Sequence, residues 1–246
     1  MIKIAHASIS ENGSVNGAAG DSTGKEVCTR SWYDKDWKYV IRFKNPEMRE
    51  KIAKAMEAAA ANNNIGYSQD SRNTLLREAE KVNWDITKIT KKCNCDCSSL
   101  VSVAAIVAGV AKKAIYINSN CATTRTLRSR LNNTGLVEVL TDAKYTDSDE
   151  YALRGDIYLK EGSHVVVALG NGSKAIQVAP APAPAALKVG DKVKVKQGAK
   201  TYNGGGLASF VYNREHQVKQ INGNRVVITY RGIVVCAIHK DSLTKV

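Results

Sequence analysis

Apolar residues recur along the first part of the chain with the period of helices, and later with the period of strands. The segments with the helical pattern are 45–64, 70–82, 98–113 and 122–135. In the first of them Asn45 is a suitable N-cap and Pro46 a suitable first helical residue. Short β-branched runs broken by glycines follow at 136–140, 155–162, 163–172 and 174–179. Helices followed by antiparallel strands predict an α+β domain.

A run of alternating alanine and proline at 179–186 separates two regions of different pattern. Such a run favours an extended spacer and cannot continue a helix or a central strand. We therefore expect one domain over residues 1–178 and a second over 187–246. The second region consists of strand patterns at 191–199, 216–223, 224–232 and 233–240. The turn Asn222-Gly223-Asn224 favours a hairpin, so this region predicts a small all-β barrel.

The charge of the chain restricts its partners. The 246 residues carry a net charge of +13, and residues 187–246 contain 11 Lys and Arg against 3 Asp and Glu. So basic a chain is typical of proteins that meet nucleic acid, an anionic membrane or an anionic wall polymer. No RNA- or DNA-binding signature favours the first.

Neither a secretory signal nor a membrane span is expected. The N-terminus lacks an apolar run of sufficient length after its early lysine, which predicts synthesis in a cytoplasm without a signal peptide. The longest apolar stretch, at 100–111, is too short to span a bilayer.

Cys93, Cys95 and Cys97 stand directly before the apolar helical segment. A structural zinc site needs four ligands, and Cys121 is the nearest further thiol. A disulfide within so short a segment is strained. A thiol at a helix start is instead placed to act as a nucleophile, because the helix dipole and free amides lower its pKa. All three cysteines are equally compatible with small buried hydrophobes.

Two motifs carry a resemblance. "DCSSLV" (96–101), followed by "RGDIYLKEGSHVVVALGNG" (154–172), resembles the papain-like cell-wall cysteine peptidases of the NlpC family and the related CHAP amidases. The segment 188–221 resembles the SH3-type wall-binding domain of phage lysins. Together they resemble a phage endolysin, which implies a papain-like domain followed by an SH3-like barrel.

The resemblance implies roles for single residues. Cys97 becomes the nucleophile and His164 its general base. A polar residue on the next strand orients the imidazole in that family, and Gln177 comes nearest to its position, with Asn171 in a turn as the alternative. His6 lies outside the motifs and is a candidate to face the cleft.

Substrate contacts are expected from aromatic residues. Trp32 and Tyr33 could line a groove or lie in the core. In the second domain Tyr202 and Tyr212 are candidates for wall binding, whereas Phe210 is expected in the barrel core. Two carboxylates are expected to be structural, Asp96 as the cap of the helix and Asp156 in the fold.

The implied function is a peptidoglycan hydrolase that cuts an amide bond for host lysis and reaches the wall through holin-type release. The identity of the cut bond stays open. An NlpC-like enzyme cuts within the stem peptide, whereas a CHAP-like enzyme is an N-acetylmuramoyl-L-alanine amidase or cuts a cross-bridge. A non-catalytic wall-binding protein and, on charge alone, a nucleic-acid binder are the other readings. The implied partners are peptidoglycan and anionic polymers of a Gram-positive wall, with no nucleic acid, membrane or cofactor, and no oligomer is indicated.

Overall fold

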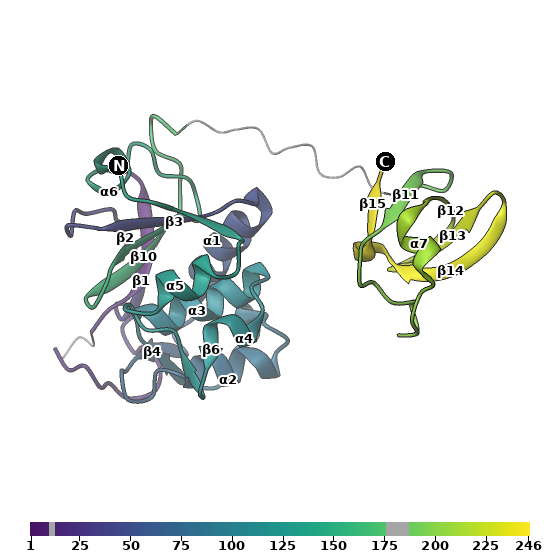
Figure 1. The fold of residues 1–246 in the computed structure, drawn as a ribbon. Coiled ribbons are helices and arrows are strands. Elements are labelled where there is room, and N and C mark those ends of the chain that lie inside the picture. The colour runs from purple at the N-terminus through teal and green to yellow at the C-terminus, as the bar shows by residue number, and fades with distance from the viewer. Residues whose placement is uncertain (10–12, 176–186) are drawn as a thin grey trace. The chain divides into compact units, whose positions relative to one another are not determined.

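The computed structural model describes residues 1–9, 13–175 and 187–246. The chain divides into two compact units, Met1–Gln177 and Val178–Val246 (Figure 1). The alanine–proline run at 179–186 and most of the strand expected at 174–179, Gln177 included, lie outside the described residues.

The first unit is organised around a six-stranded antiparallel sheet of order β2-β1-β10-β9-β3-β8. Its strands are β1 (Lys3–Ala7), β2 (Val27–Ser31), β3 (Tyr39–Phe43), β8 (Val137–Leu140), β9 (Ile157–Lys160) and β10 (His164–Ala168). The strands expected at 136–140, 155–162 and 163–172 are present as β8, β9 and β10.

The sequence pattern suggested that the helices precede the strands, and this order is wrong. β1, β2 and β3 come from the first 43 residues and supply half of the sheet. β1 lies beside β10, with Ile4 opposite Ala168 and Ala5 opposite Val167. The pairing brings the chain's first strand next to the strand that begins at His164.

The helices of this unit begin and end for local reasons. They are α1 (Pro46–Ala60), α2 (Thr74–Lys81), α3 (Cys97–Ala108), α4 (Lys112–Ile115), α5 (Leu127–Asn132) and α6 (Ala143–Thr146). Asn45 caps α1 as predicted, since its side chain accepts a hydrogen bond from the Glu47 N–H at 2.8 Å. Gly109 ends α3 at a φ of 114°, a left-handed conformation that suits glycine. No helix in the described ranges is long and apolar enough to cross a membrane.

Two short pairs of strands complete the unit. β4 (Ile65–Tyr67) runs parallel to β5 (Cys93–Cys95), and β6 (Tyr116–Ile117) pairs antiparallel with β7 (Asn120–Cys121). Gly66 in β4 has no room for a side chain, because an added Cβ would lie 2.4 Å from the Gly20 carbonyl oxygen. The Gly20 N–H also donates to the Cys93 carbonyl oxygen at 3.2 Å, so the same loop contacts β5, which leads directly into α3.

The sheet is covered on both faces. α1 and α3 pack against each other and against β1 and β10, and their apolar side chains join one large core with Ile41 and Phe43 of β3. A smaller cluster around Trp32, Trp37 and Tyr158 covers the opposite face. In Figure 1, α1, α3 and α5 lie together on one side of the strands.

The second unit is mainly β, with an antiparallel sheet of order β14-β13-β12-β11-β15. Its elements are β11 (Lys192–Val195), α7 (Ser209–Asn213), β12 (Glu215–Asn222), β13 (Arg225–Tyr230), β14 (Ile233–His239) and β15 (Leu243–Lys245). The predicted hairpin is confirmed, with Asn222 opposite Arg225. The predicted closed barrel is not found in the described residues, because β14 and β15 remain the two ends of the sheet. A separate aliphatic core that includes Val193, Val226 and Ile228 holds the unit together.

Candidate active site

The start of α3 is a fully formed helix cap. Asp96 is the N-cap: its side chain accepts from the Ser99 N–H at 2.7 Å, while Ser99 Oγ accepts from the Asp96 N–H at 2.8 Å. The structural role predicted for Asp96 is confirmed. Cys97 is the first residue of the helix that this cap fixes.

A buried arginine that the sequence did not single out holds the cap. Arg72 donates to both carboxylate oxygens of Asp96, at 2.6 and 3.1 Å, and to Ser98 Oγ at 2.8 Å. It also donates to the carbonyl oxygens of Cys121 and Ala122. Arg72 therefore ties the start of α3 to the segment around β7.

Burial dominates the chemistry of the Cys97 thiol. The residue is 7% exposed, and burial raises the pKa of its thiol to about 12, although N–H groups of Val165 and Ser98 and the charge of Arg72 act to lower it. The prediction that the helix start lowers the pKa of this thiol is therefore wrong. Desolvation opposes the thiolate more strongly than the helix terminus favours it.

The neighbouring cysteines occupy a different setting. Cys93 and Cys95 lie in β5 and are buried in the main core. All six cysteines are free, so Cys97 forms no disulfide with Cys93 or Cys95. No group of three or more His, Cys, Asp or Glu suited to a metal occurs in the ranges that the structure describes.

Two histidines meet at the start of β10. His164 Nε2 lies 3.0 Å from His6 Nδ1 of β1, and Trp37 stacks on the His164 ring with centroids 6.3 Å apart. One of the two N–H groups that contact the Cys97 thiol belongs to Val165, the residue after His164 in the strand. Because Val165 directly follows His164, the His6–His164 pair lies close to the start of α3.

Both imidazoles are neutral at ordinary pH. Burial first, then the charges of His6, Lys35 and Arg30, lowers the pKa of His164 to about 3. Burial and Arg30 lower the pKa of His6 to about 4. At pH 7 the site therefore holds a neutral thiol and two uncharged imidazoles.

Cys28 adds a further contact to the His6–His164 pair. Cys28 of β2 stands opposite His6 in the sheet, and its Sγ lies 3.7 Å from His6 Nε2. Each ring nitrogen of His6 consequently has a partner, His164 on one side and Cys28 on the other. Such contacts select the tautomer of an imidazole.

A cleft of about 290 Å³ opens beside the histidines. The residues that line it include His6, His164, Tyr33, Arg30, Lys35, Tyr67 and Gln69. Tyr67 also lies near Cys97, since burial and, more weakly, the charge on Cys97 raise its pKa to about 12. Trp32 instead packs edge-on against Tyr158 in the smaller core cluster, away from the cleft lining.

The candidates for the orienting group separate clearly. Asn171 Oδ1 accepts from the Arg154 N–H at 2.9 Å and so holds the turn after β10. Asp156 is likewise structural, buried and paired with Arg42 at 2.7 Å. Gln177 lies outside the described residues. His6 is the side chain in contact with His164, and the alternation of Ile2, Ile4 and His6 in a short strand was its only sequence signal.

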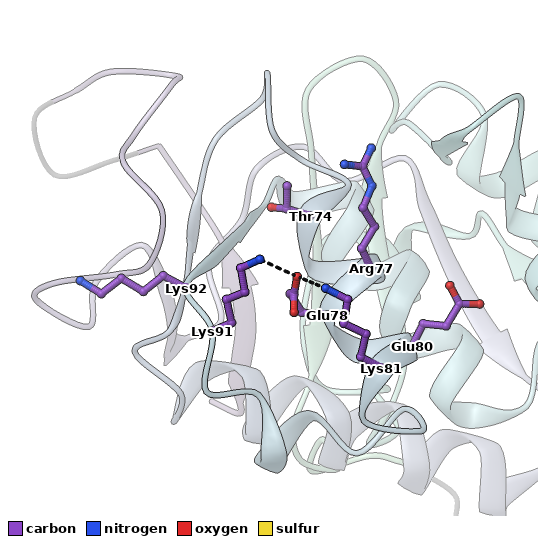
Figure 2. A pocket seen from close by; sticks show the side chains of 7 residues that line it. All are labelled: Thr74, Arg77, Glu78, Glu80, Lys81, Lys91 and Lys92. Carbon is purple, nitrogen blue, oxygen red and sulfur yellow. Dashed lines mark hydrogen bonds and ion pairs between the residues drawn. The ribbon is translucent and has the colours of Figure 1, made fainter.

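A larger hollow, of about 550 Å³, lies elsewhere, along α2. Figure 2 shows Lys81 and Lys91 both reaching Glu78, with Arg77 and Lys92 nearby. Its described lining contains neither a cysteine nor a histidine. The size of a hollow alone therefore does not identify the candidate active site.

The aromatic candidates of the second unit divide by exposure. Tyr202 is 44% exposed and stacks on His239 at 6.2 Å, whereas Tyr212 is half-buried and donates to the Ala199 carbonyl at 2.7 Å. Phe210, expected in the core, is 42% exposed and lies under the Arg214 guanidinium.

A family model described as an endolysin-like domain matches residues 4–175, most of the first unit. No curated protein and no solved structure matches the chain.

Proposed function

The chain belongs to the endolysin-like domain family, and on that basis we propose that it is a phage peptidoglycan hydrolase in which Cys97 is the nucleophile. The observation that carries this proposal is the pairing of His164 with His6 beside the capped helix start of Cys97. A papain-like arrangement needs these parts: a thiol at a helix start, a base on a neighbouring strand and a group that orients the base.

The reaction follows from the protonation states. As Cys97 Sγ attacks the carbonyl carbon of the scissile amide, His164 takes the thiol proton, because neither group is charged beforehand. Amide N–H groups at the start of α3 stabilise the oxyanion. His164 then gives the proton to the leaving nitrogen as the C–N bond breaks. Water, deprotonated by His164, hydrolyses the thioester and restores the thiol.

We assign the orienting role to His6. When His164 becomes an imidazolium, its Nε2–H donates to His6 Nδ1. The neutral His6 imidazole then carries its own proton on Nε2. Cys28 Sγ accepts from that Nε2–H. The chain Cys97–His164–His6–Cys28 thus supports the positive charge that appears on the base during attack.

The second unit serves as a wall-targeting module of the SH3 type in this proposal. Its 11 Lys and Arg against 3 Asp and Glu suit the anionic polymers of a Gram-positive wall. Exposed Tyr202 and Phe210 are the candidates for contacts that do not depend on charge. Release to the wall by a holin completes the proposed role.

The cut bond is identified by mass spectrometry of digested peptidoglycan. New amino termini within stem peptides indicate an endopeptidase of the NlpC kind, and free lactyl groups indicate an N-acetylmuramoyl-L-alanine amidase. Walls that bind the protein but release neither product would favour a non-catalytic wall-binding protein instead.

A further inference from the structure

The cleft beside the histidines is positively charged. Arg30 of β2 and Lys35 of the β2–β3 loop both line it, and both are exposed. Among the described lining residues there is no Asp or Glu. The cleft therefore presents two positive charges to whatever enters it.

Nearby carboxylates are engaged elsewhere. Asp34 accepts from the Asp36 N–H at 2.7 Å, and Asp36 pairs with Lys38 and with Lys160. Arg30 lies over the Tyr33 ring at 4.5 Å, a contact that leaves its N–H donors free to bind an anion. Within the described residues, neither Arg30 nor Lys35 forms an ion pair.

The two cations act on the catalytic base itself. Lys35 and Arg30 both contribute to the lowered pKa of His164. An anion held by them lies close to the reacting atoms and not at a remote part of the substrate. A bound anion also offsets the positive charge of Arg30 and Lys35, which disfavours the imidazolium that His164 forms during the reaction.

We propose that Arg30 and Lys35 form a carboxylate-binding subsite, so that the enzyme prefers a scissile amide whose neighbouring residue carries a free carboxylate. Arginine and lysine bind carboxylates through charge-assisted hydrogen bonds, and a carboxamide at the same place offers neither the charge nor a second acceptor oxygen. This inference rests on the proposed hydrolase function.

The test uses the full chain and two synthetic stem-peptide fragments that differ only in a free carboxylate or a carboxamide beside the cut bond. We expect kcat/KM to favour the carboxylate by about tenfold or more, as hydrogen bonds to charged groups do. Lys35→Gln and Arg30→Gln should each reduce that ratio, and Lys35→Glu should invert it. Lys38→Gln, which alters a paired lysine that does not line the cleft, should leave the ratio unchanged.

The outcomes separate the two proposals. Equal cleavage of both fragments by the unaltered protein, or a ratio that Lys35→Gln leaves untouched, overturns the subsite while the hydrolase stands. Cleavage of neither fragment and of no purified wall overturns the hydrolase. Lys35 is exposed, so its variants are expected to fold even if Arg30→Gln disturbs the packing on Tyr33, and melting temperatures check this.

Discussion

His6 has the position of an orienting residue, held between His164 and Cys28 by both ring nitrogens. We expect His6→Ala to lower the rate of wall hydrolysis about 10²-fold with little change in KM, because the base loses its tautomer control and not its substrate. Gln177→Ala should retain the activity of the unaltered protein. The opposite pair of results, an active His6→Ala and an inactive Gln177→Ala, would return the orienting role to Gln177.

Cys28 offers a finer test of the same chain. Cys28→Ser keeps an atom that accepts from His6 Nε2–H, and Cys28→Val removes it at similar size. We expect kcat to fall several-fold in the valine variant and to stay near normal in the serine variant, with equal melting temperatures. Equal kcat in both variants would show that the thiol contact has no positioning role.

The lowered pKa values of the histidines set a pH dependence. Since His164 titrates near 3, the acid limb of kcat/KM should lie below about pH 5, well under the ordinary imidazole pKa of about 6.5. The free energy of unfolding should fall as pH drops from about 6.5 towards 4, because unfolded histidines bind protons there and folded ones do not. An acid limb at an ordinary imidazole pKa would place the base in a more solvated site.

Arg72 secures the helix start on which Cys97 stands. Removing one partner of a buried ion pair leaves an unpaired charge, so Arg72→Met should lower the free energy of unfolding by about 3–5 kcal/mol. Arg77→Met, on the exposed side of α2, should change it by less than about 0.5 kcal/mol. Chemical denaturation of both variants measures the free energy of unfolding. Similar values for the two would show that the Arg72–Asp96 ion pair does not stabilise the fold.

Local signals predicted some elements well and missed others. Asn45 and Pro46 marked the start of α1, and "DCSSLV" marked the start of α3, because caps are determined by neighbouring residues. β1 to β3 were missed, since five-residue strands near charged, glycine-rich segments have weak periodicity. His6 was a candidate to face the cleft, and it does line it. Its contact with His164 was not predicted, because the two residues are 158 positions apart and only sheet pairing brings them together.

Burial explains the main error about chemistry. A helix start favours a thiolate, and the sequence showed that start correctly. It could not show that Cys97 would be 7% exposed, a consequence of how α3 packs on β10. Desolvation depends on the whole fold, and it reversed the expected direction of the thiol pKa.

The two units predict a division of labour on intact walls. We expect residues 187–246 to bind purified walls alone, and residues 1–178 to hydrolyse intact cells more slowly than the full chain but soluble fragments almost as fast. Salt should weaken part of the binding, because exposed charges are screened within about 10 Å at 0.1 M ionic strength. Fluorescence of labelled fragments on walls measures this. Binding by 1–178 as strong as by the full chain would assign the second unit another role.

The proposed hydrolase activity depends on one thiol among three neighbouring cysteines, so replacing each of the three in turn is the decisive comparison. The rate of turbidity loss of purified walls is measured for Cys97→Ala, Cys93→Ala and Cys95→Ala, with melting temperatures as the folding control. Cys97→Ala should abolish hydrolysis while the other two retain most of it, because only Cys97 stands at the capped start of α3 beside β10. Full activity of a folded Cys97→Ala protein would contradict cysteine catalysis in this chain.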